Sequence, residues 1–257
     1  MEYLIICGVS LIAAGLTLFS GFGLGTLLLP AFALFFPAEV AVGMTAVVHL
    51  TNNLFKFALL GKHADKSVAM RFGIPAIFAA LIGAKMLLFI ANLPSIYNWQ
   101  MADFHFSITP VNLTIGILMI LFAIVEILPN LKNFSLEQKW LPFGGALSGF
   151  FGGLSGHQGA LRSIFLLRAG LTKEAFIATG VVIACVIDIS RIFIYSERFS
   201  GQHFEGNYLL LIAAMLTAFL GAYIGSKLLK KVTMNIVQTI VSILLILLGL
   251  ALGAGII

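Results

Sequence analysis

The chain has 257 residues, of which 60% are hydrophobic and only 10% are charged. Soluble globular domains are about one quarter charged, so this composition excludes an ordinary soluble domain and indicates a polytopic membrane protein. The formal net charge of +5 does not indicate nucleic-acid binding, because no basic, aromatic surface accompanies it, and an excess of Lys and Arg in a membrane protein reports its orientation. We expect a single membrane domain over residues 1–257, with the lipid bilayer as its surroundings and no nucleic-acid partner.

Apolar segments recur from the first residues onward. The N-terminal stretch MEYLIICGVSLIAAGL has no basic n-region and no evident cleavage site, so we expect a retained membrane segment and no signal peptide. In chain order, the apolar segments predict helices near 2–19, 24–36, 39–60, 70–92, 109–128, 140–152, 157–170, 173–196, 207–228 and 232–256. Three of them, at 24–36, 140–152 and 157–170, are shorter than the roughly 20 residues that a span requires. Each is expected to be half of a broken span or one arm of a hairpin that enters and leaves on one side.

The two halves of the chain, 1–128 and 139–257, resemble each other. Matching stretches lie at an offset of 134 or 142 residues: Gly43–Leu50 with Ile177–Ala184, Gly25 with Gly159, and Ile82–Leu88 with Ile224–Lys230. Duplicated halves of this kind are common in transporters. We therefore expect an all-α polytopic membrane protein built from two repeats, each a re-entrant or broken helical hairpin followed by three transmembrane helices. An odd number of spans in each half makes the two repeats inverted.

Each half contains one glycine-rich break. The first is SGFGLGTLLLP (Ser20–Pro30), and the second is GGLSGHQGALR (Gly152–Arg162). Freed backbone groups inside a bilayer are tolerated only where protein or a water-filled cavity meets them. Helices that begin at such breaks direct free N–H groups toward the midplane, where these groups can hold an anion. In the alternative interpretation, the glycines only allow neighbouring helices to pack closely.

Basic residues discriminate between two paths for the second break. If the segment around Gly149–Gly159 crosses the membrane once, the two sides receive six and five basic residues. If it is re-entrant, they receive ten and one, which the positive-inside rule strongly favours. The second break is therefore predicted to be re-entrant, and the first is inferred to be so only from the repeat. This arrangement places the basic loops in the cytoplasm and both termini outside.

The order of these motifs resembles one known family. A glycine-rich break that leads to an apolar run and Pro30, then AVGMTAVVHLTNN, then a second break followed by GLTKEAFIATG (Gly170–Gly180), is similar to the TauE/SafE sulfite exporter family over essentially the whole chain. The resemblance implies a multi-pass protein of a bacterial cell (inner) membrane that transports sulfite, sulfonates or other sulfur-containing anions. The chain departs from the family at one place. Where the family often has a Thr-Ser pair, this chain has MTAVVH, and His49, Asn52 and Asn53 give the helix a more polar face.

Basic side chains at membrane depth are the main candidates for anion contact. A charge there costs several kcal/mol unless it is paired or functional. Arg162 lies about one turn past the tip of the second break, Gly156–Gly159, and can clamp a sulfonate or carboxylate with two parallel hydrogen bonds; an internal salt bridge with Asp188 is the alternative. For Arg191, three residues after Asp188, substrate contact and an i,i+3 ion pair both remain open. Lys56 is expected to reach the surface near Lys62, and the sequence assigns no role to a fourth basic residue, Lys85.

Further candidates lie at the two breaks and on the helix that follows the first one. These residues are Gly23, Gly25, His49, Asn52, Asn53, Gly156, His157 and Gln158. His49 and Asn53 are four residues apart and share a helix face. His49 can be a carrier of a coupling proton, since imidazole titrates near pH 6.5, or an interhelical hydrogen bonder.

The function predicted from these features is secondary transport of a small organosulfur anion such as sulfite or a sulfonate (sulfoacetate or a taurine-like compound). The anion is expected near the midplane, between the two glycine-rich breaks, with transport by alternating access. No Walker loop, metal-ligand spacing or nucleophile elbow occurs in the sequence, so neither an enzyme nor a cofactor is expected. An anion channel on the same scaffold and a non-transporting membrane scaffold are the alternatives. A homodimer is compatible with the sequence, which specifies neither the direction of transport nor the coupling ion.

Overall fold

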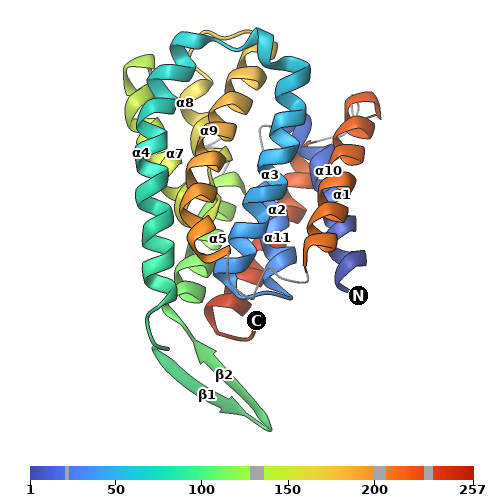
Figure 1. Ribbon diagram of the computed structural model, residues 1–257, viewed down its shortest axis with the longest axis vertical. Helices are drawn as coiled ribbons and strands as arrows, with labels where there is room; N and C mark the ends of the chain where they lie inside the picture. Colours follow the sequence, from blue (N-terminus) through green and yellow to red (C-terminus); the bar gives the residue numbers. More distant parts are fainter. Residues whose placement is uncertain (21–22, 128–135, 200–206, 229–233) are drawn as a thin grey trace.

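The computed structural model describes residues 1–20, 23–127, 136–199, 207–228 and 234–257. Long helices run roughly side by side along the longest axis of the molecule (Figure 1). In chain order the elements are α1 (Glu2–Ser20), α2 (Leu24–Ala33), α3 (Ala38–Leu60), η1 (Gly61–His63), α4 (Lys66–Ala91), β1 (Tyr97–Met101), β2 (Phe104–Ile108), α5 (Pro110–Ile127), η2 (Gln138–Trp140), α7 (Leu141–Ser155), α8 (Gly159–Leu166), α9 (Lys173–Phe199), α10 (Tyr208–Leu228) and α11 (Met234–Gly253).

The helices agree with the predicted segments and differ mainly at their ends. Helix α4 begins at Lys66, four residues before the predicted start, because the Asp65 side chain caps it by accepting a 2.9 Å hydrogen bond from the backbone N–H of Val68. Helices α2 and α8 are shorter than predicted and end at Ala33 and Leu166. Both therefore remain too short to cross a bilayer.

A two-stranded antiparallel hairpin, β1–β2, joins α4 to α5 and projects beyond the helices (Figure 1). The sequence pattern predicted no helix or strand in this segment. Trp99 on β1 stacks on Phe106 of β2 with ring centroids 4.4 Å apart, and its indole N–H donates a 2.9 Å hydrogen bond to the backbone oxygen of Ala254. The hairpin is thus held both by its own aromatic pair and by the C-terminal end of the chain.

The apolar helices make this a multi-pass helical membrane protein. Within the ranges described, three helices are long and apolar enough to cross a membrane by length and composition: Lys66–Ala91, Lys173–Ser196 and Tyr208–Gly225. Shorter apolar helices cover Glu2–Thr17, Leu24–Ala33, Pro110–Val125 and Thr239–Gly253. Large apolar side chains such as Phe78 and Phe89 of α4 are exposed on the outer surface, as expected for side chains that face lipid.

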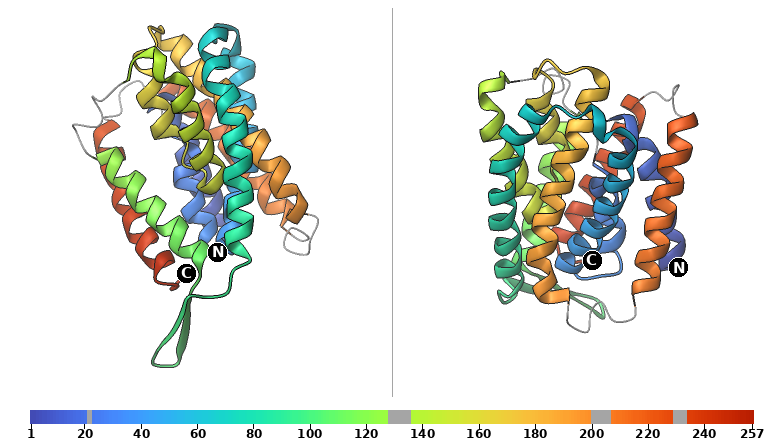
Figure 2. Two further views of the ribbon diagram at one scale, coloured as in Figure 1. Left: turned by 90° about the vertical axis from the view of Figure 1, so that its left-hand side faces the viewer. Right: turned by 45° about the horizontal axis from the view of Figure 1, so that its top comes forward.

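Helices of the first half pack against helices of the second. Helix α4 packs along α7, α1 along α10, α5 along α11 and α3 along α9 (Figure 2). Glycine allows the closest of these approaches. A Cβ atom added to Gly149 or Gly153 of α7 would lie 2.2 Å from the backbone oxygen of Ala76 or Ala80 of α4. A Cβ atom added to Gly221 of α10 would lie 2.0 Å from the backbone oxygen of Leu11 of α1. Such contacts are typical of small-residue interfaces between membrane helices.

The second glycine-rich break is a sharp reversal of the chain. Helix α7 ends at Ser155, Gly156 adopts a left-handed conformation with φ of 82°, and α8 begins at Gly159. Just before α7, the Gln138 side chain donates a 2.8 Å hydrogen bond to the backbone oxygen of Ala169, just after α8. The two ends of the α7–α8 hairpin therefore lie together, at the same end of the molecule (Figure 2).

The α4–α7 interface predicts a strong effect of a single methyl group. Gly149→Ala places a Cβ against the backbone of α4, which cannot yield as a flexible side chain would. We expect the free energy of unfolding to fall by about 1–3 kcal/mol, measured by denaturant or thermal unfolding of the purified protein in detergent.

Gly8→Ala is the matched control, because an added Cβ meets nothing within 4 Å there. This substitution in α1 should leave stability unchanged or raise it by up to about 1 kcal/mol through helix propensity. Equal unfolding midpoints for the two variants would contradict the close approach of α4 and α7.

Candidate functional site

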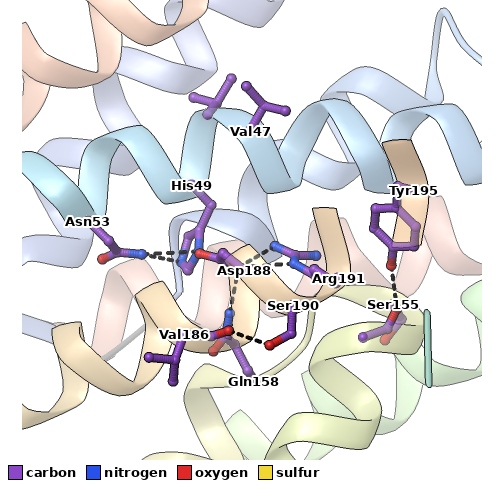
Figure 3. Close-up of polar contacts among 12 residues, drawn as sticks. Val47, His49, Asn53, Ser155, Gln158, Val186, Asp188, Ser190, Arg191 and Tyr195 are labelled. Atoms are coloured by element: carbon purple, nitrogen blue, oxygen red, sulfur yellow. Dashed lines mark hydrogen bonds and ion pairs between the residues drawn. The ribbon is translucent and has the colours of Figure 1, made fainter. Parts of the chain in front are cut away.

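The interior polar site is centred on Asp188, a fully buried carboxylate of α9. Its Oδ1 atom accepts hydrogen bonds from Arg191 Nε at 2.9 Å and from Gln158 Nε2 at 3.0 Å. Arg191 Nη2 also lies 2.8 Å from Oδ1, which completes an i,i+3 ion pair on α9. The second oxygen, Oδ2, lies 2.5 Å from Nδ1 of His49 on α3. Asp188 thus joins α3, α9 and the tip of the α7–α8 hairpin (Figure 3).

Two further side chains extend this network. The amide nitrogen of Asn53 lies 3.1 Å from Nδ1 of His49, one helical turn earlier on α3. The other end of the Gln158 amide, Oε1, accepts a 3.3 Å hydrogen bond from Arg162 Nη1. Gln158 therefore connects the Arg162 guanidinium to the Asp188 carboxylate without a direct ion pair between them.

A cavity of about 50 Å³ adjoins the network between α1, α2, α3, α8 and α9. Its polar lining consists of Thr17, His49, Asn53, Lys56, Arg162 and Ser163. Leu24, the first residue of α2, borders it as well. One water requires roughly 10–15 Å³ of such space, so the cavity has room for about three to five waters or for one small oxyanion.

The cavity carries excess positive charge. Lys56 and Arg162 are only 6% and 9% exposed. Among the residues that the structure describes, Lys56 has no hydrogen-bond or ion-pair partner, and Arg162 has only the Gln158 amide. Asp188 is already paired with Arg191. Lys56, Arg162 and Arg191 are three cations, and Asp188 is the one carboxylate, so the formal charge of this cluster is +2 when His49 is neutral. Burying such an excess charge without a counter-ion costs several kcal/mol.

The structure brings six of the predicted site residues together. His49, Asn53 and Arg162 line the cavity, while Gln158, Asp188 and Arg191 form the hydrogen-bonded group behind it. The alternative partner expected for Arg162, Asp188, is instead bound by Arg191. Hence Arg191 forms the ion pair with Asp188, and the Arg162 guanidinium contacts only the Gln158 amide among the described residues.

Other predicted residues lie near the cavity without lining it. Gly23 is the N-cap of α2, and Cβ atoms added to Gly23 and Gly25 would each lie 3.9 Å from the His49 ring. Such an atom on Gly25 would also lie 3.6 Å from the backbone oxygen of Gly156, so the first turn of α2 meets the tip of the α7–α8 hairpin beside this histidine. Asn52 of α3 is fully buried, and its amide atoms have no hydrogen-bond partner among the described residues.

His157 does not line the cavity. Its ring stacks on Phe122 of α5 at a centroid distance of 5.2 Å and an angle of 8°. Its Nδ1 atom lies 3.1 Å from the Ser155 hydroxyl oxygen. The position at the break predicted ligand contact, whereas the packing of α5 against the tip directs this side chain to an aromatic partner.

The expectation for Lys56 was wrong. The sequence predicted that its side chain reaches the surface near Lys62, but the structure buries it in the cavity wall. A signal was present, because His49, Asn53 and Lys56 follow the i, i+4, i+7 spacing of one helix face. Lys85, to which no role was assigned, is exposed on the outer surface of α4.

Comparison with known proteins adds one finding. A protein-family model described as "Sulfite exporter TauE/SafE" matches residues 6–252, nearly the whole chain. No curated protein matches the sequence.

The buried ion pair predicts a large cost when its cation is removed. Arg191→Met leaves the Asp188 carboxylate without its ion-pair partner in the interior, so we expect about 3–5 kcal/mol of lost stability. Denaturant unfolding in detergent measures the loss.

The control is the exposed pair between Lys139 and Glu137, whose side chains lie 2.8 Å apart and are 66% and 67% exposed. Lys139→Met should change the free energy of unfolding by less than about 1 kcal/mol. If Arg191→Met were as mild as this control, Asp188 would not depend on Arg191.

Proposed function

Because the chain belongs to the TauE/SafE sulfite exporter family, we propose that it carries sulfite or a closely related sulfur oxyanion through the cavity beside Lys56 and Arg162. The observation that carries the proposal is the formal +2 charge of the buried cluster that adjoins this space. A divalent oxyanion would balance that charge, and the guanidinium of Arg162 offers parallel N–H donors suited to two of its oxygens.

The size of the cavity favours a small substrate. Sulfite has one sulfur and three oxygen atoms, and this number of heavy atoms matches the three to five waters for which about 50 Å³ has room. A larger sulfonate such as sulfoacetate or a taurine-like compound would require the surrounding helices to separate. Within the family's range of sulfur-containing anions, sulfite therefore fits this arrangement best.

Polar groups other than the two cations complete the proposed site. The Thr17 hydroxyl lines the cavity, is buried and has no hydrogen-bond partner among the described residues, so it is free to donate to an anion. Helix α2 begins at Leu24 on the cavity wall, and no side chain caps its N-terminus. Its first backbone N–H groups can thus contribute to anion binding, as helix N-termini do elsewhere.

We further propose that transport proceeds by alternating access of two inverted halves. In the repeat, α1 corresponds to α7, α3 to α9, α4 to α10 and α5 to α11. The packing supports the scheme, because the α4–α7 contact then has its counterpart in the α10–α1 contact, while α3–α9 and α5–α11 each pair two corresponding helices. At the α5–α11 contact, Cβ atoms added to Gly116 and Gly249 would lie 2.5 Å and 2.9 Å from each other's backbone oxygens. In this scheme α1–α2 and α7–α8 are the two re-entrant hairpins, whose tips meet at Gly25 and Gly156.

The proposed orientation places the basic end of the molecule in the cytoplasm. The turns η1 and η2 and the α8–α9 connection lie at one end, and they carry Lys62, Lys139 and Arg168. Both termini and the β1–β2 hairpin lie at the other end (Figure 1), and residues 92–109 contain neither Lys nor Arg. This asymmetry supports a bacterial inner-membrane protein with its termini outside. Three of the basic residues counted for the positive-inside rule, Lys132, Lys230 and Lys231, fall outside the described residues.

Arg162 provides the direct test of the anion site. Arg162→Gln removes the charge and its parallel donors, so sulfite should bind about 10- to 150-fold more weakly, as expected for hydrogen bonds to a charged group. Calorimetric titration of the purified protein with sulfite measures the affinity. Arg168→Gln, an exposed position just beyond α8, is the matched control and should bind sulfite as the wild type does.

Flux measurements separate the transporter from the two alternatives. The wild type in proteoliposomes should show saturable sulfite uptake at carrier rates, and Lys56→Met should reduce it at least about tenfold at subsaturating sulfite, by the same loss of a charged donor. Conductance far above carrier rates would indicate a channel. The absence of a thermal shift with sulfite, sulfate, thiosulfate and sulfonates, together with the absence of flux, would indicate a scaffold and contradict the proposal.

A further inference from the structure

We infer that the His49–Asp188 pair takes up a proton when the anion binds, which makes the proton the coupling ion of this transporter. The inference rests on the proposed function and concerns the same site. His49 Nδ1 lies 2.5 Å from Asp188 Oδ2, and the two residues are 3% and 0% exposed. The imidazole also lines the cavity, so one ring contacts both the carboxylate and the space proposed for the anion.

The two oxygens of Asp188 have different partners. Oδ1 is occupied by Arg191 and Gln158, whereas Oδ2 has only His49 among the described residues. Because Arg191 already neutralises the carboxylate, the imidazole need not be charged for Asp188 to be paired in the interior. The protonation state of His49 is therefore free to follow the occupancy of the cavity.

The proton has a defined place on the ring. With Asp188 ionised, Nδ1 carries the hydrogen that Oδ2 accepts, and Nε2 is the nitrogen that gains the proton. Nε2 lies 3.3 Å from the amide nitrogen of Asn53 and 3.9 Å from the Cβ position at Gly23. Uptake adds one proton from cavity water to Nε2, which breaks that proton's bond to water and the hydrogen bond that Nε2 accepts from the Asn53 amide.

The charges around the imidazole couple this proton to the anion. Asp188 and Arg191 face it from α9, Arg162 from α8 and Lys56 from its own helix. Helices α1 and α2 contribute to the cavity wall only Thr17 and Leu24 among the described residues, and neither titrates. Protonation raises the formal charge of the cluster from +2 to +3, which is unfavourable in the empty cavity and much less so beside an oxyanion. By linkage, the anion and the proton raise each other's affinity by the same factor.

The other buried histidine of the described region is a built-in control. His157 is 3% exposed, stacks on Phe122 and lies next to the Ser155 hydroxyl, and it does not line the cavity. A nonspecific effect of losing a buried imidazole should appear equally at both positions, whereas proton coupling should appear only at His49.

The experiment counts protons taken up per sulfite bound. Calorimetric titration of the full-length protein in two buffers of different ionisation enthalpy yields this number for the wild type, His49→Gln and His157→Gln. The proton carried by sulfite itself is the same in all three and cancels in the comparison. His49→Gln should take up fewer protons than the wild type, by as much as one, and His157→Gln should match the wild type. The wild-type affinity should also fall with rising pH more steeply than that of His49→Gln, by up to about tenfold per pH unit.

The outcomes separate this inference from the proposed function. Sulfite binding with equal proton counts in the wild type and His49→Gln, or an equal loss in His157→Gln, overturns the inference and leaves the sulfite site intact. Failure of the wild type to bind sulfite overturns both. Glutamine retains an N–H donor for Asp188, and thermal unfolding verifies that the variants fold.

If His49→Gln does not fold, the inference can be tested with the wild type alone, by measuring sulfite uptake into proteoliposomes under a pH gradient. At a fixed concentration of sulfite dianion, an acidic outer solution should raise the initial uptake rate. A rate independent of the pH gradient overturns the inference.

Discussion

The interior depends on one buried carboxylate. Asp188 accepts hydrogen bonds from a cation on its own helix and from the amide of Gln158 at the hairpin tip, and it contacts His49 on α3. A buried charge is tolerated only when it is paired and hydrogen-bonded, so these three contacts fix the relative positions of α3, α9 and the tip. Because Arg191 uses the carboxylate, Arg162 and Lys56 are left facing a small cavity without an acidic partner among the described residues. The proposed anion site is a consequence of this pairing of Asp188 with Arg191.

Glycine packing determines how the carboxylate meets its partners. Helices α4 and α7 approach so closely that Gly149 and Gly153 touch the backbone of α4, which sets the position of α7. Helix α7 ends at Gly156, where a left-handed residue reverses the chain and places Gln158 against Asp188. The glycines of this segment therefore have two structural roles, and one of them is the close helix packing of the alternative interpretation raised by the sequence. Those along α7 allow close packing, and the one at the tip allows the turn from which the polar contacts arise.

Much of this arrangement could be predicted from the sequence, and its failures have identifiable causes. Helical periodicity located the helices, and the second glycine cluster located the reversal between α7 and α8, because these signals are local. The β1–β2 hairpin carries little local signal, since it depends on the Trp99–Phe106 stack and on a hydrogen bond to Ala254, far along the chain. His157 was expected at the ligand, but Phe122 of α5 provides a stacking partner that no local pattern shows. The start of α4 was missed although its capping residue, Asp65, stands in the sequence.

The sequence by itself determined a helical membrane protein with two glycine-rich breaks, membership of a sulfur-anion exporter family, and a small set of charges too costly to bury without a role. Only the tertiary structure decided how those charges are shared. Arg162 and Arg191 were both possible partners of Asp188, and Lys56 was expected at the surface although it lies in the cavity wall. Helical periodicity specifies which residues share a face, but not which other helix that face meets. The packing of α3, α8 and α9 makes that choice, and it leaves one arginine paired, one arginine and one lysine at the cavity, and a histidine between them.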